Sequence, residues 1–105
     1  MTESRDAPRP YRVAYSGRVR LELERLVERA RALGRGNQVI VALKAIDYRL
    51  RIYPQFGQPL YDLKLEPAKI WVACVPPLVV QYFLDEERRV VMVATPIVPV
   101  PFSGL

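Results

Sequence analysis

The side chains with the clearest potential for chemistry in this sequence are basic. The 105 residues include 16 Lys and Arg, 11 Asp and Glu and no histidine, which gives a formal net charge of +5. Residues 1–58 hold twelve of the basic residues and only six of the acids. A basic surface attracts nucleic acid or an acidic partner segment, because neutralising negative charge gives affinity without demanding a particular sequence. The alternative is an Arg-rich helix face that is simply solvated.

Nucleophilic, metal and phosphate-loop chemistry find little support. Cys74 stands alone in an apolar segment without a histidine to act as its base, so we expect a buried, inert thiol and a reducing compartment. For the same reason we expect no metal site, and we expect no cofactor. The acids at 85–87 belong to a turn, where solvated carboxylates are normal, and Gly34-Arg35-Gly36 separates two helical segments instead of following a strand.

The C-terminal half predicts an antiparallel meander. Three runs rich in β-branched and aromatic side chains predict its strands, at residues 70–75, 78–84 and 90–93. Pro76-Pro77 separates the first two runs, and a charged turn separates the last two. Only Gln81 interrupts the apolar second run, so we expect a central strand that is covered on much of both faces. Residues 11–15 predict a half-buried first strand, and residues 60–65 predict an edge strand.

Two amphipathic helices are expected between the first strand and the meander, at residues 18–33 and 38–53. Their apolar stripes are Val19, Leu23, Leu26, Val27, Ala30 and Leu33 in the first, and Val39, Leu43, Ile46, Leu50 and Tyr53 in the second. We expect Ser16 to cap the first helix, Gly34 to end it and Asn37 to cap the second. The short link between them predicts an antiparallel helical hairpin whose stripes face the sheet.

The chain is long enough for one domain, and three regions differ in composition. We expect residues 1–10 to form a disordered tail, and they lack the apolar core of a signal peptide. We expect residues 11–95 to form the folded domain and residues 96–105 to form a Pro-rich apolar extension. No apolar run is long enough to span a membrane. The extension either folds back over the protein's own sheet or forms a surface for a partner or for self-association.

The order of elements and several local patterns resemble a known family. The patterns are the opening Tyr-Arg-Val-Ala-Tyr-Ser, the helical hairpin, the exit Pro54-Gln55-Phe56-Gly57, and the strand at 78–85 that is followed by 89–93. Together they resemble the RelE/ParE superfamily of type II toxin–antitoxin toxins over most of residues 11–95. The resemblance implies an α+β fold of order β-α-α-β-β-β(-β), with the helical hairpin packed on an antiparallel sheet.

The resemblance also implies a function. Members of this family are small cytoplasmic toxins held inactive by a cognate antitoxin, and they act on the ribosome and its mRNA or on DNA gyrase. For this chain it implies growth inhibition through translation, RNA binding and plasmid stabilisation, in a toxin–antitoxin hetero-oligomer or a homodimer. The alternatives are a gyrase-directed toxin and a catalytically degenerate member that acts only as a binding module.

The RNase branch of the family carries basic residues on the middle strands and a basic or tyrosine-bearing C-terminal segment. Lys69 occupies one such basic position and Tyr82 is the second catalytic candidate, whereas Trp71 and Leu78 stand where other basic residues are expected. The extension has no ionisable side chain, although phosphoryl chemistry needs fixed positive charge. Whether the chain is a ribosome-dependent endoribonuclease therefore stays open. The candidates for target binding are Arg49, Arg51, Lys64 and Arg88.

Overall fold

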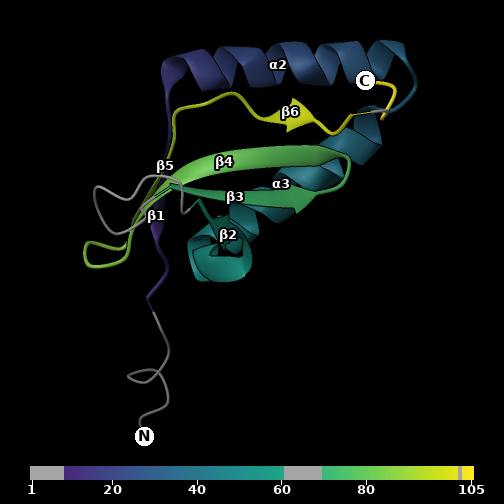
Figure 1. Cartoon of the computed structure of the whole chain (residues 1–105). Coiled ribbons are helices and arrows are strands. Elements are labelled where there is room, and N and C mark those ends of the chain that lie inside the picture. The colour runs from purple at the N-terminus through teal and green to yellow at the C-terminus, as the bar shows by residue number, and fades with distance from the viewer. Residues whose placement is uncertain (1–8, 61–69, 102) are drawn as a thin grey trace, which may run out of the picture.

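The computed structural model describes residues 9–60, 70–101 and 103–105, and shows two helices beside a sheet (Figure 1). The helical elements are α2 (Gly17–Ala32), α3 (Gly36–Ile52) and the short 3-10 helix η1 (Pro54–Phe56). The strands are β1 (Arg12–Tyr15), β2 (Gln58–Pro59), β3 (Ile70–Val75), β4 (Leu78–Asp85), β5 (Val90–Val93) and β6 (Val98–Pro99). The predicted α+β class is confirmed.

The sheet has the strand order β1-β5-β4-β3-β2, and β6 pairs with β4 beside this path. Strands β3, β4 and β5 form the predicted antiparallel meander. In contrast, β1 pairs with β5 in parallel, so the sheet is mixed and the prediction of a wholly antiparallel sheet was wrong in this pair. A parallel pair requires a long connection, and here the helical hairpin and the first strands of the meander supply it. The predicted edge strand at 60–65 falls mostly outside the described residues.

The described residues bury one face of the sheet much more completely than the other. Along β4 the side chains of Leu78, Val80, Tyr82 and Leu84 are buried, and those of the alternate residues are half-buried or exposed. The prediction that much of both faces of this strand is covered therefore holds for one face, and the described residues cover the other face only in part. Cys74 belongs to the uncovered face and is exposed, because its neighbours Ala73 and Val75 take the two buried positions of β3. The prediction of a buried thiol was wrong.

The helical hairpin forms, but Leu33 of the predicted first stripe is 52% exposed because α2 ends at Ala32, and the cap of the second helix also differs. The backbone N–H of Val19 donates to Ser16 Oγ at 3.1 Å, and Gly34 follows α2 with a φ of 74°. However, α3 begins at Gly36, and the residue before it makes no side-chain capping bond. Asn37 therefore lies inside the first turn and does not cap the helix. Gly36 is needed there because a Cβ would lie 2.7 Å from Arg31 Cγ.

The two helices pack against each other, and α3 contacts β1, β3 and β4 (Figure 1). The inner face of α3 contributes Val39, Ala42, Ile46 and Leu50 to the core. Tyr53, which the predicted stripe also included, is 58% exposed because the helix ends at the residue before it.

The C-terminal extension folds back over the protein's own sheet. Strand β6 runs antiparallel to the start of β4, with Val98 opposite Val79, and lies between α2 and β4 in Figure 1. The backbone N–H of Val100 donates to Pro77 O at 2.8 Å, and Ile97 is buried in the core. The Arg35 guanidinium holds the far end by donating to the carbonyl of Ser103.

Candidate functional site

The C-terminal turn of α3 carries Arg49 and Arg51, two of the predicted binding residues. The Arg49 guanidinium carbon lies 5.5 Å from the centroid of the Phe56 ring, a cation–π geometry. Arg51 donates to both carboxylate oxygens of Asp47, at 2.8 Å from Nε and 3.2 Å from Nη2. The Tyr15 hydroxyl donates to the same carboxylate at 2.7 Å. Both arginines are therefore held in defined positions at an exposed helix end.

The pKa shifts of this cluster follow from its hydrogen bonds. Burial alone would raise the pKa of Asp47, but the hydrogen bonds from Arg51 and Tyr15 outweigh it and lower that pKa below its usual value. Burial raises the pKa of Tyr15, and the hydrogen bond to Asp47 raises it further. At neutral pH the carboxylate is thus charged and the phenol is neutral. Asp47 consequently neutralises part of the charge of Arg51.

A second polar cluster joins the β4–β5 turn to the end of α3. The Gln55 amide donates to Tyr11 Oη at 3.0 Å and to Glu86 Oε2 at 2.8 Å. The Arg89 guanidinium carbon lies 4.3 Å from the centroid of the Tyr11 ring. Tyr11 also donates its backbone N–H to the carbonyl of Arg51 at 2.6 Å. These contacts bring the turn to the end of the helix.

That turn carries Arg88, the third predicted binding residue that the structure describes. Its side chain is largely exposed and pairs with Asp85 at 3.5 Å. Arg88 therefore lies at the same end of the molecule as Arg49 and Arg51. Lys64 and Lys69 lie outside the described residues.

Tyr82 has the environment of a core residue. It is 2% exposed, its hydroxyl donates to the carbonyl of Pro54, and its ring stacks on Phe56 with centroids 6.3 Å apart. Burial raises its pKa to about 12. Gly57 allows the loop to approach this closely, because a Cβ there would lie 2.6 Å from both Tyr82 Oη and Val72 O. This geometry argues against the predicted catalytic role of Tyr82, since its hydroxyl is enclosed and already bonded.

The uncovered face of the meander is mostly apolar. Its outward side chains on the described strands are Ile70, Val72, Cys74, Val79, Gln81, Phe83, Asp85, Val90 and Met92. None of these is a Lys or an Arg. Trp71 and Leu78, which stand at two expected basic positions, instead pack against or within the core. Among the described residues, the face of β3–β5 therefore offers no fixed positive charge for a phosphate.

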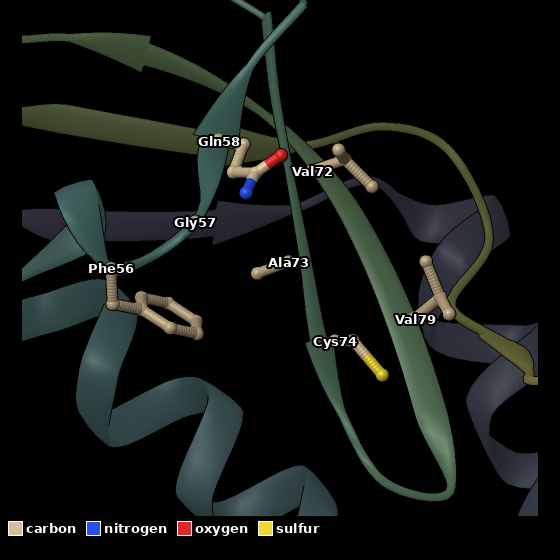
Figure 2. Close-up of a pocket in the computed structure, with 7 residues that line it drawn as sticks. All are labelled: Phe56, Gly57, Gln58, Val72, Ala73, Cys74 and Val79. Atoms are coloured by element: carbon tan, nitrogen blue, oxygen red, sulfur yellow. The ribbon is translucent and has the colours of Figure 1, made fainter.

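An open cavity of about 350 Å³ lies at one end of this region (Figure 2). The residues that line it are Phe56, Gly57, Gln58, Val72, Ala73, Cys74 and Val79. Figure 2 shows the Phe56 ring and the Cys74 thiol as part of this lining, which contains no charged side chain. Sequence reasoning missed the cavity because the apolar run around Cys74 does not reveal which of its faces is covered. The lining offers no cationic side chain to a phosphate.

In the part of the chain that the structure describes, no three His, Cys, Asp or Glu side chains come close enough to hold a metal ion. Within the same part, no helix combines the length and apolar character that crossing a membrane requires.

Comparison with known proteins places the fold. No family model matches the sequence, and no curated protein matches it. Among solved structures, the toxin–antitoxin complex RelBE2 from Mycobacterium tuberculosis contains a chain that superposes with a TM-score of 0.63. The match covers 86% of this chain and 91% of that one, at 20% sequence identity. The chain has a RelE-like fold. The predicted RelE/ParE-like architecture is thereby confirmed, and at this identity the likeness concerns the fold.

Proposed function

We propose that this chain is the toxin of a type II toxin–antitoxin system, which acts in the cytoplasm on the ribosome and its mRNA and is neutralised by a cognate antitoxin. The observation that carries the proposal is the fold, which the chain shares with a component of the RelBE2 complex over most of its length. The exposed side chains of Arg49, Arg51 and Arg88 support it, because guanidinium groups suit contact with RNA phosphates.

Growth under induced expression tests this proposal. Expression of the chain alone should stop growth, and co-expression of a small acidic protein from the neighbouring reading frame should restore it. The Arg49→Glu/Arg51→Glu double variant should weaken the arrest while keeping the circular dichroism of the folded protein. Unimpeded growth with soluble, folded protein in the cell would contradict the proposal.

The apolar face of the meander favours a second candidate. A ribonuclease stabilises the charge that develops on phosphate with fixed cations, and the described face of β3–β5 provides none. A toxin that acts by binding, on DNA gyrase or as a catalytically degenerate module, does not need them. Growth arrest with unchanged translation and reduced supercoiling by gyrase in vitro would select the gyrase-directed reading. No growth arrest, with a partner protein still bound, would select the binding module.

A further inference from the structure

Helix α3 has a second apolar stripe, on the side that the core does not use. Val41 is 66% exposed, Tyr48 is 63% exposed and Ile52 is 44% exposed, and all three lie along one line of the helix. With Gln38 and the half-buried Ala45 they are spaced by three, four, three and four residues. We call these five residues the outer seam of α3. The spacing is that of the a and d positions through which one helix packs against another.

The side chains that border the outer seam are cationic. In the same heptad frame, Lys44 and Arg51 take the g positions and Arg49 takes an e position, and all three are exposed. The only acid on α3 is Asp47, whose carboxylate is already occupied by Arg51 and Tyr15. Because e and g residues set the choice of partner in helix pairs, this border attracts a helix with acidic flanks.

The same charges disfavour a second copy of this chain as the occupant. In a parallel pair of α3 helices, Lys44 of one copy would face Arg49 of the other, and in an antiparallel pair Lys44 of one copy would face Arg51 of the other. Like charges at these positions oppose association. Nucleic acid would be attracted by the cations but has no need of exposed valine, tyrosine and isoleucine side chains between them.

We propose that the outer seam of α3 docks an acidic amphipathic helix of a partner protein, with apolar residues on its contact side and Glu or Asp along its flanks. The identity of that partner as the neutralising antitoxin rests on the proposed function. The helix-in-groove mode predicts anchors at spacings of three and four residues on the partner. Tyr48 is the expected main anchor, because exposed aromatic side chains contribute most to such interfaces.

The test uses the full chain and labelled helical peptides of about three heptads, with leucine at the a and d positions. One peptide carries Glu at its e and g positions, a second carries Lys there, and a third is a scramble of the first. Binding is measured by fluorescence anisotropy and mapped by NMR shifts. We expect the Glu peptide to bind at least about tenfold more tightly than the other two, with shifts along the outer seam. Equal affinities, or shifts confined to α2 or the sheet, would overturn the proposal.

Variants at exposed positions sharpen this test. Tyr48→Glu should weaken binding of the Glu peptide by about tenfold or more. Lys44→Glu should weaken binding of the Glu peptide less than Tyr48→Glu does. This loss of affinity should be smaller at high salt, because it is electrostatic. The matched control is Leu21→Glu, which replaces a 48% exposed apolar residue on α2 and should leave binding unchanged. Unfolding curves check that each variant is folded, and Val41→Ser replaces Tyr48→Glu if the latter is not.

Two results would assign the surface to another occupant and overturn the proposal. One is a wild-type dimer in solution that Tyr48→Glu converts to monomer. The other is competition by single-stranded RNA that depends on Lys44 and not on Val41. These binding measurements do not depend on growth arrest. A failure of the outer seam to bind a helix can therefore be told apart from a failure of the proposed toxin function.

Discussion

Tyr82 connects the sheet to the loop that follows α3. Its hydroxyl donates to Pro54 O and its ring stacks on Phe56, and the Arg49 guanidinium lies against the same Phe56 ring. Through this chain of contacts a core tyrosine holds the loop and an exposed arginine in place. The sequence could not show this, because an alternating apolar strand places its tyrosine equally well on either face. Only the covering of that face by α3 makes Tyr82 a structural residue.

Replacing Tyr82 by phenylalanine separates the structural role from the catalytic one. Tyr82→Phe removes one buried hydrogen bond and should lower the free energy of unfolding by about 1 kcal/mol, with growth arrest retained. Urea denaturation and the growth assay measure the two effects. A variant that is as stable as the wild type but no longer arrests growth would show that the Tyr82 hydroxyl has a chemical role, which would contradict the structural role given to it here.

Ionisation of the Tyr82 phenol should lower the free energy of unfolding at alkaline pH. Burial raises the pKa of Tyr82 to about 12, whereas an unfolded tyrosine titrates near pH 10. The folded state therefore holds the proton more strongly, so this contribution is complete below about pH 10 and is lost as the pH rises toward 12. Tyr15, whose pKa burial also raises, acts in the same direction. Unfolding free energies measured across this range should fall, and should fall less steeply in Tyr82→Phe.

The elements that sequence reasoning predicted well are those whose signals are local. Ser16 and Gly34 delimit α2 because a hydroxyl cap and a left-handed glycine act within a few residues of themselves. The meander also follows from its own turns. Pairings between distant segments had no such signal: β1 joins β5 across most of the chain, and β6 occupies an edge of β4 that β5 leaves free.

The exposure of Cys74 and the outer seam of α3 were missed for a related reason. In both places apolar residues occupy more than one face of an element, and a hydrophobic pattern alone does not tell which face is covered. Val41 on α3 is the same residue type as Val39, yet Val39 is in the core and Val41 is 66% exposed. Apolar residues in excess of what the core needs are a signal for a partner once the fold is known.

Capping of the two helices gives a prediction with an internal control. Ser16→Ala should lower the free energy of unfolding by about 1 kcal/mol, because the N–H of Val19 loses its acceptor. Asn37→Ala should change it by less than about 0.5 kcal/mol, since Asn37 makes no capping bond. Urea denaturation of both variants decides the matter. A larger loss for Asn37→Ala would mean that Asn37 caps α3, which would then begin at Gln38 as the sequence predicted.

In the part of the molecule that the structure describes, the cations gather away from the uncovered face of the meander. The described cations concentrate on the helices, at the end of α3 and in the β4–β5 turn, while the uncovered face of the meander is mostly apolar. This distribution fits a protein that approaches an anionic target or partner through its helical side. It also explains why the fold was easier to predict than the activity, because a shared fold does not fix the residues on its surface.

Cell-free translation with purified protein tests the central claim most directly. If the chain is a toxin that acts on the ribosome and its mRNA, the folded protein should reduce the yield of a reporter in a dose-dependent manner at concentrations comparable to that of ribosomes. The Arg49→Glu/Arg51→Glu variant should inhibit less. An unchanged reporter yield in the presence of excess folded protein would contradict the account.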